Sequence, residues 1–282
     1  MAEKMPEDEA GVFYIYRENY YLLYEATADV KDILDFDEIF RPIYEKYIKH
    51  GKRTRYIDFN QGVDARLVSE HTMKRLSEIN IRPLRIAFDH YEQKSIYIKA
   101  VKLAAQYGIK DLSNYLLYNF KDRPDELFYR MKINVDLCES LRVTIYSFPM
   151  KYHPIDDPNY FRNRDFIGEH WNRKFIRAIQ AVLNATKGKI GRGKDFFEEA
   201  FGRNLDEFYD ILWMPETFII YRMKYKDNLT AEWKTKFHSL SSKQEEVAKR
   251  IIAINDFSDK ALHQTKSKKV LDVLSYYKIA RK

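Results

Sequence analysis

The sequence has 282 residues and a mass of 33.9 kDa, and its 49 Lys and Arg residues outnumber 42 Asp and Glu residues to give a net charge of +7. No stretch approaches the roughly 18 consecutive apolar residues that a membrane-spanning helix needs, so we expect a cytoplasmic protein with no membrane contact. The only cysteine is Cys138. One thiol cannot build a disulfide framework, a cysteine-ligated zinc site or an iron–sulfur cluster within this chain.

Acidic and basic residues are unevenly distributed along the chain. Residues 1–50 contain 6 basic and 12 acidic side chains, whereas residues 151–282 contain 26 basic and 18 acidic ones. The basic excess in the last part is compatible with an anionic partner, including nucleic acid. A solvated, lysine-rich helical surface is the alternative explanation.

The first 50 residues predict two elements. Residues 12–24 read VFYIYRENYYLLY, two aromatic runs around a polar turn, and this pattern predicts a β-hairpin. Residues 37–50 have apolar side chains at helical spacing and predict a helix.

Short apolar runs alternate with amphipathic segments in the middle of the chain. The apolar runs are at 56–59, 84–88, 112–120 and 143–148, and the amphipathic segments are at 69–79, 92–107 and 123–140. Strands separated by helices of this length form βαβ units. We therefore expect the α/β class, with four parallel strands in a sheet or partial (β/α) barrel. Ser69 is the candidate N-cap of the first helix.

The remainder of the chain, residues 156–282, predicts a mostly helical, basic C-terminal domain. Helical patterns cover 163–184, 194–202, 204–213, 216–226, 230–238, 242–254 and 265–279. Ser242 and Glu245 have the spacing of a capping box. The expected organisation is thus an acidic segment with a hairpin at 1–36, a partial barrel at 37–155 and this helical domain.

Polar side chains follow directly after the expected strands. They are Asn60, Gln61, Asp64, Arg66, Asp89, Asn119 and Lys151, and Met150 lies beside them. Ligands bind at the C-terminal ends of parallel strands, so these residues would converge on one candidate cofactor-binding site. The alternative is that polar residues simply begin where strands end.

Four segments together resemble the last four strands of the radical S-adenosylmethionine (SAM) enzymes, and are most similar to an uncharacterised group of that family. They read DFNQGVDARL at 58–67, PLRIAFD at 83–89, SNYLLYNFKDRPDELFYR at 113–130 and VTIYSFPMKYHP at 143–154. The resemblance covers residues 37–155 and implies part of the radical SAM barrel. It also implies specific roles. Asp89 and Asn119 would hold the ribose and adenine of SAM, Arg66 would meet its carboxylate, and Met150 would pack on the adenine.

The chain departs from this family in one respect that decides the expected activity. It lacks the Cys-x3-Cys-x2-Cys loop with which radical SAM enzymes ligate a 4Fe–4S cluster. We therefore expect a vestigial SAM or nucleotide pocket, no cofactor held by the chain alone, and no radical SAM activity unless a partner chain supplies the cluster. A cluster-free scaffold, a split enzyme and a truncated remnant all fit the sequence. A partner chain or a second copy would also cover the open edge of a partial barrel.

A basic loop at 187–194 is the second candidate site. The segment reads KGKIGRGK and carries four cations before a predicted helix, at Lys187, Lys189, Arg192 and Lys194. It departs from the P-loop because Asp195 stands where that motif has a magnesium-binding hydroxyl, and because a helical pattern precedes it. Such a loop can bind a phosphate or nucleic acid at the helix N-terminus. A solvated connection between two helices is the alternative.

Overall fold

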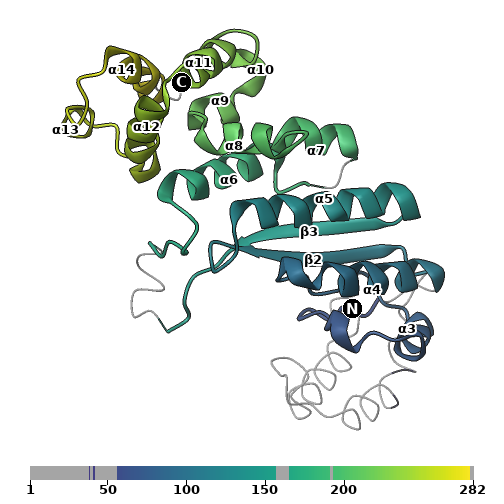
Figure 1. The fold of residues 1–282 in the computed structure, drawn as a ribbon. Helices are drawn as coiled ribbons and strands as arrows, with labels where there is room; N and C mark the ends of the chain where they lie inside the picture. Colours follow the sequence, from purple (N-terminus) through teal and green to yellow (C-terminus); the bar gives the residue numbers. More distant parts are fainter. Residues whose placement is uncertain (1–37, 39–40, 42–55, 157–164, 191–192, 280–282) are drawn as a thin grey trace, which may run out of the picture. The chain divides into compact units, whose positions relative to one another are not determined.

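The computed structural model of this chain describes residues 38, 41, 56–156, 165–190 and 193–279 (Figure 1). The chain divides into two units after Arg55, and the second unit, residues 56–282, contains nearly all of the described residues. The hairpin expected at 12–24 lies outside the described residues. So does the helix expected at 37–50, except for Glu38 and Arg41, which are helical.

Three parallel strands form an open sheet in the order β1-β2-β3 (Figure 1). The strands are β1 (Leu84–Arg85), β2 (Asp111–Tyr118) and β3 (Thr144–Lys151). The helices before and between them are η2 (Ala65–Leu67), α3 (Glu70–Ser77), η3 (Tyr91–Gln93), α4 (Lys94–Gln106) and α5 (Pro124–Leu141). The expected α/β class with parallel strands is confirmed, and so is the N-cap of α3, where the Ser69 hydroxyl accepts from the Thr72 N–H.

The expected strand at 56–59 is wrong. Ile57 and Val63 each make an isolated parallel bridge to the chain around β1, but no ladder forms. Between them the chain turns, and the Gly62 N–H donates to the Phe59 carbonyl oxygen at 2.7 Å. Because this turn carries the backbone away from the sheet after one paired residue, the apolar run cannot extend into a strand.

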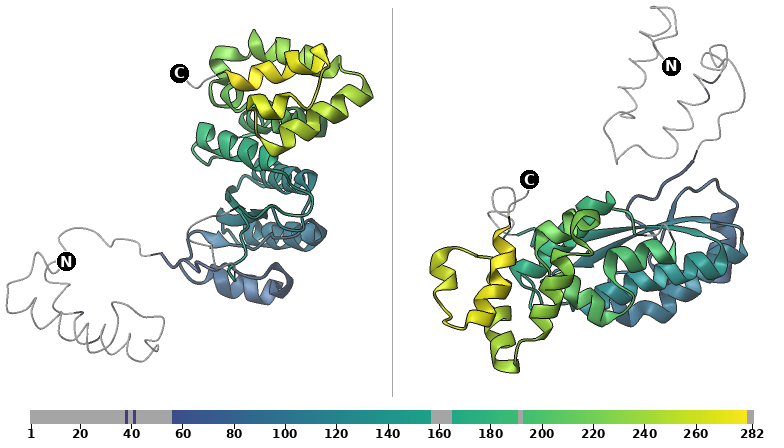
Figure 2. Two further views of the ribbon diagram at one scale, coloured as in Figure 1. Left: turned by 90° about the vertical axis from the view of Figure 1, so that its left-hand side faces the viewer. Right: turned by 90° about the horizontal axis from the view of Figure 1, so that it is seen from above.

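Helices α4 and α5 cover one face of the sheet (Figure 2). The apolar residues of this face are Leu112, Leu116 and Tyr118 of β2 and Ile145 of β3. A buried polar network lies between this face of the sheet and the two helices. Asn134 of α5 donates to the Ser147 hydroxyl at 2.7 Å and to Asn114 Oδ1 at 3.2 Å. The Tyr97 hydroxyl of α4 donates to Asn134 Oδ1 at 2.8 Å, so both helices are tied to the same face.

The described residues after 165 are predominantly helical, as the sequence predicts. The helices are α6 (Arg173–Thr186), α7 (Lys194–Phe201), α8 (Leu205–Trp213), α9 (Glu216–Ile220), α10 (Arg222–Tyr225), α11 (Leu229–His238), α12 (Ser242–Ile254), α13 (Asp259–Leu262), α14 (Lys268–Ser275) and η4 (Tyr276–Lys278).

Several of these helices depart from the predictions, in their bounds or in their caps. Helix α6 begins ten residues later than expected, because Asn172 caps it by accepting from the Phe175 N–H. The expected helix at 216–226 breaks at Tyr221 into α9 and α10. The capping box of α12 lies one residue earlier than predicted and pairs Ser241 with Gln244.

This unit contains two apolar cores. The first joins the sheet, α4 and α5 to α6, α7 and α8, and includes the buried residues Ile179, Phe197 and Phe208. The second includes Trp233 of α11 and Val270 of α14 and also contains residues of α12. The helices that follow the sheet therefore share its core, whereas the last helices pack around a core of their own.

Candidate binding site on the open face of the sheet

The second face of the sheet is the candidate site, because no helix that the structure describes packs over its aromatic side chains. Its residues pair in register across β2 and β3, as Ser113 with Tyr146, Tyr115 with Phe148 and Leu117 with Met150. Tyr146, Phe148 and Met150 remain 41%, 36% and 46% exposed. The Tyr146 and Phe148 rings lie 4.3 Å apart between centroids, and the Phe148 and Tyr115 rings lie 5.6 Å apart. We call these six residues the open face.

Arg85 of β1 borders the open face, and its charge is already compensated. Its guanidinium makes two hydrogen bonds to the Asp58 carboxylate, both 2.8 Å, and one to the Ser113 hydroxyl at 3.2 Å. It also lies over the Tyr115 ring, 5.6 Å from the centroid. The hydrogen bond from Arg85 lowers the pKa of Asp58. The open face is therefore nearly neutral and aromatic, which suits a flat, uncharged ring more than a phosphate.

Arg130 of α5 holds together the C-terminal ends of the strands. Its side chain is fully buried and donates to the carbonyl oxygens of Phe88 at 3.3 Å, Asp89 at 2.9 Å and Leu117 at 2.7 Å. It also pairs with Asp122 at 3.2 Å. Burial lowers the pKa of the Arg130 guanidinium and raises the pKa of the Asp122 carboxyl. This buried cation fixes the chain after β1 against the end of β2.

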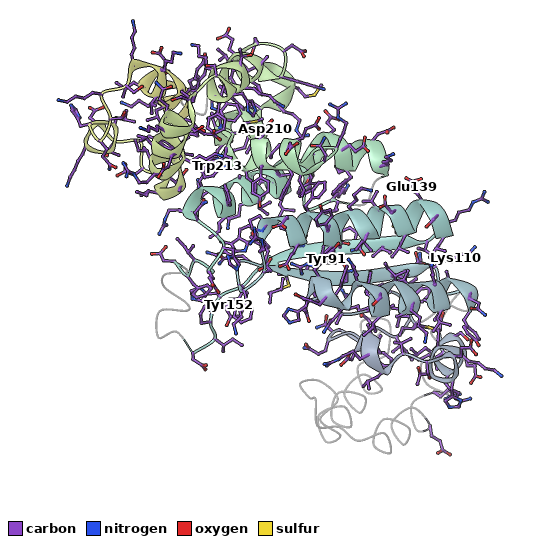
Figure 3. All side chains as sticks on the ribbon, in the orientation of Figure 1. Tyr91, Lys110, Glu139, Tyr152, Asp210 and Trp213 are labelled. Atoms are coloured by element: carbon purple, nitrogen blue, oxygen red, sulfur yellow. The ribbon has the colours of Figure 1, made fainter. Side chains whose placement is uncertain are left out.

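Asn119, which follows β2, also has a structural role. Its φ is 69°, and its amide donates to the carbonyl oxygens of Tyr152 at 3.2 Å and Phe166 at 3.0 Å. Its Oδ1 accepts from the Gly168 N–H at 2.9 Å. A Cβ at Gly168 would lie 2.3 Å from the Phe120 carbonyl oxygen, so only glycine allows this approach. Asn119 thus joins the ends of β2 and β3 to residues 166–168. Tyr152, whose carbonyl oxygen accepts from Asn119, is labelled in Figure 3.

The structure brings some of the expected site residues together at this end of the sheet. The Asp89 side chain is exposed. The Arg130 guanidinium donates to the carbonyl oxygens of both Asp89 and Leu117. Leu117 is in turn the register partner of Met150. Asp89 and Met150 therefore lie at the same end of the sheet. Lys151 ends β3 and is half-buried.

The expected site residues of segment 60–66 are placed differently. Asn60 and Gln61 are exposed in the turn that leads to Val63. Asp64 accepts from Arg66 in a bidentate pair whose shortest distance is 2.6 Å, and the Arg66 side chain is 64% exposed. The hydrogen bonds from Arg66 lower the pKa of Asp64. Arg66 would therefore have to leave this carboxylate to bind another one.

The aromatic residues of the open face and the buried Arg130 are not among the residues that the sequence singles out. A signal for the first was present in residues 143–151, where Tyr146, Phe148 and Met150 alternate with smaller residues at the strand period of two. A signal for Arg130 was its position on the apolar stripe of α5, three residues after Leu127.

The helix end beside the basic loop already receives a carboxylate. The backbone N–H of Lys194, the first residue of α7, donates to Glu139 Oε1 at 3.3 Å (Figure 3). Ile190 is buried in the first core and fixes the loop from beneath. Lys187 is exposed, Lys189 is half-buried, and Arg192 lies outside the described residues. An anion at the N-terminus of α7 would have to displace Glu139.

Among the residues that the structure describes, no group of three or more His, Cys, Asp and Glu side chains could hold a metal ion, and no helix is long and apolar enough to span a membrane. A scan against protein-family models, a search of curated proteins and a search of solved structures each found no match for this chain.

Proposed function

We propose that the open face binds the adenosine part of a SAM-type ligand, in a radical-SAM-like protein that holds no cluster of its own and is non-catalytic alone or dependent on a partner chain. The observation that carries this proposal is the exposure of Tyr146, Phe148 and Met150 on a sheet whose other face is covered, among the described residues, by α4 and α5.

The one-sided helical layer also supports the proposed partial barrel. In a (β/α) barrel, helices lie only on the outer face of the strands, whereas a doubly wound parallel sheet carries helices on both faces. The described sheet has α4 and α5 on one face and the open face on the other. The open face then corresponds to the inner wall of the barrel, where radical SAM enzymes bind their nucleoside.

The chemistry of the residues at the strand ends suits an adenosine. Adenine stacks on aromatic and thioether side chains, which Phe148 and Met150 present to solvent. The exposed Asp89 carboxylate supplies acceptors for the ribose hydroxyls. Because the Asn119 amide is committed to Tyr152, Phe166 and Gly168, its contact with the adenine in this proposal comes from its backbone.

Removal of an open-face side chain should weaken SAM binding. In isothermal titration calorimetry with the full chain, we expect Phe148→Ala to raise the Kd for SAM about tenfold, since loss of one stacking contact costs about 1–3 kcal/mol. Met150→Ala should raise it less. The matched control is Met223→Ala, because Met223 is 86% exposed on α10.

The control variant should bind SAM with the affinity of the unsubstituted protein. Undetectable binding of both SAM and S-adenosylhomocysteine to the unsubstituted chain would refute the proposal. Equal affinities in Phe148→Ala and Met223→Ala would remove the ligand from the open face. If charge reversal at Lys187 and Lys189 weakened SAM binding while the open-face variants bound SAM normally, the result would instead favour an anion site in the basic loop.

A further inference from the structure

Strand β3 lies at one end of the sheet, so one of its edges faces β2 and the other pairs with no strand that the structure describes (Figure 1). We call the second edge the outer edge of β3. The strand is eight residues long. An edge of this length presents a row of backbone N–H and C=O groups with which another chain can pair, unless something blocks it.

The hydrogen bonds to β2 identify the residues of the outer edge. The Thr144 N–H donates to the Lys110 carbonyl oxygen at 2.8 Å. The Tyr152 N–H donates to the Tyr118 carbonyl oxygen, also at 2.8 Å. Successive residues of a strand direct their backbone groups alternately to its two sides. The even-numbered residues from 144 to 152 therefore face β2, and the outer edge is formed by Ile145, Ser147, Pro149 and Lys151.

One hydrogen-bond donor of the outer edge is missing because of the residue type. Proline has no backbone N–H, so Pro149 cannot donate to a further strand. Within sheets, proline is tolerated on edge strands, where its nitrogen faces away from the neighbouring strand. Pro149 has this orientation, since the residues on either side of it are the ones that face β2.

A second donor of the outer edge is already bound within the chain. The Ile145 N–H donates to Cys138 Sγ at 3.3 Å. Cys138 lies on α5, which packs against β3, so this helix covers the beginning of the edge. Ile145 is only 2% exposed. A further strand would have to displace the sulfur atom before it could pair with this residue.

The two blocked positions alternate with the remaining ones along the edge. Ile145 and Pro149 are separated by Ser147, and Pro149 separates Ser147 from Lys151. A strand that paired with the outer edge would therefore never find two successive N–H donors. Because a ladder is stabilised by consecutive hydrogen bonds, this spacing disfavours strand addition over the whole length of β3.

We propose that Cys138 and Pro149 close the outer edge of β3, so that neither a second copy of this chain nor a strand of a partner extends the sheet there. A further strand would instead have to join on the side of β1, where the chain around Ile57 and Val63 makes isolated bridges only. The inference concerns an edge of the sheet and does not depend on nucleoside binding to the open face.

The test opens the edge in the full chain. The double variant Cys138→Ala/Pro149→Thr frees one N–H and restores the other, whereas the unsubstituted protein keeps both blocked. In sedimentation velocity experiments over a range of protein concentrations, we expect the double variant to self-associate at least about tenfold more tightly than the unsubstituted protein, an effect of one or two gained hydrogen bonds. Hydrogen exchange measured by mass spectrometry should show that residues 144–151 become protected as it associates.

The matched control is Cys138→Ala/Pro154→Thr, because Pro154 follows the end of β3. It should associate no more than the unsubstituted protein. A folded double variant that stays monomeric would refute the proposal, and so would association that leaves residues 144–151 unprotected. Association of the unsubstituted protein with protection of residues 144–151 would show that the edge is open. Thermal unfolding checks the fold, and if the double variant does not fold, Pro149→Thr against Pro154→Thr provides the same comparison.

Discussion

Replacement of Arg130 by methionine should lower the free energy of unfolding by about 3–5 kcal/mol, the usual cost of removing one member of a buried ion pair. The side chains of Arg130 and Asp122 are 0% and 9% exposed, so the remaining carboxylate would be left largely desolvated. The carbonyl oxygens of Asp89 and Leu117 would also lose their donors. Denaturant unfolding followed by circular dichroism measures the change.

The control for this prediction is Arg75→Met on α3. Arg75 pairs with Glu78 and its side chain is 69% exposed, so the substitution should cost no more than about 1 kcal/mol. If Arg130→Met destabilised the protein no more than Arg75→Met, then Arg130 would not fix the strand ends as described.

Replacement of Lys174 by methionine should stabilise the protein at pH 7 by about 2–4 kcal/mol. The Lys174 ammonium on α6 is fully buried and has no hydrogen-bond partner among the described residues. Burial lowers the pKa of Lys174 from 10.5 to about 7, although Glu216 opposes the shift. Glu216 accepts two hydrogen bonds from Arg177, each 2.9 Å, so its carboxylate compensates the charge of Arg177 as well as that of Lys174.

The same burial predicts how stability depends on pH. Between pH 7 and 10.5 the unfolded chain holds a proton on Lys174 that the folded chain releases. The free energy of unfolding of the unsubstituted protein should therefore rise with pH across this window. Lys174 contributes up to about 1.4 kcal/mol per pH unit to this rise.

Comparison of variants isolates this contribution. Lys174→Met should lack the rise in stability above pH 7, whereas Lys243→Met, at an exposed site, should keep it. Denaturation curves at pH 7, 8 and 9 measure the difference. A less stable Lys174→Met protein at pH 7, or one with an unchanged pH dependence, would show that the ammonium is solvated in the folded protein.

The succession of elements could be predicted because hydrophobic periodicity and local caps are properties of short segments. Ser69 caps α3, and the apolar runs at 112–120 and 143–148 correspond to β2 and β3. The run at 56–59 is also rich in apolar and aromatic residues, but strand formation needs a partner over several residues, and the turn at Gly62 prevents this. Strand pairing is a tertiary property that composition does not encode.

The site was predictable only in part. Asp89 and Met150 lie at one end of the sheet because parallel strands bring their C-terminal ends together. The engagement of Asn119 depends on residues 166–168, which are about fifty positions away and carry no local signal. The pairing of Arg66 with Asp64, in contrast, joins two residues that are only two positions apart, so it could have been predicted from the sequence.

Lys174 and Arg130 were missed because charged residues are expected at the surface. Both lie on the apolar stripes of their helices, with Lys174 four residues before Ala178 and eight before Val182. A charged residue on such a stripe is the pattern that indicates a buried charge. Whether the charge is paired, as for Arg130, or has no hydrogen-bond partner, as for Lys174, depends on neighbours that only the folded structure identifies.

The most direct test of nucleoside binding on the open face is photolabelling of the full chain with 8-azido-S-adenosylmethionine, followed by peptide mapping. We predict that labelling falls on residues 144–152 and 111–118, that excess SAM prevents it, and that Phe148→Ala reduces it. Labelling confined to α6–α14, or labelling that excess SAM does not reduce, would contradict the account.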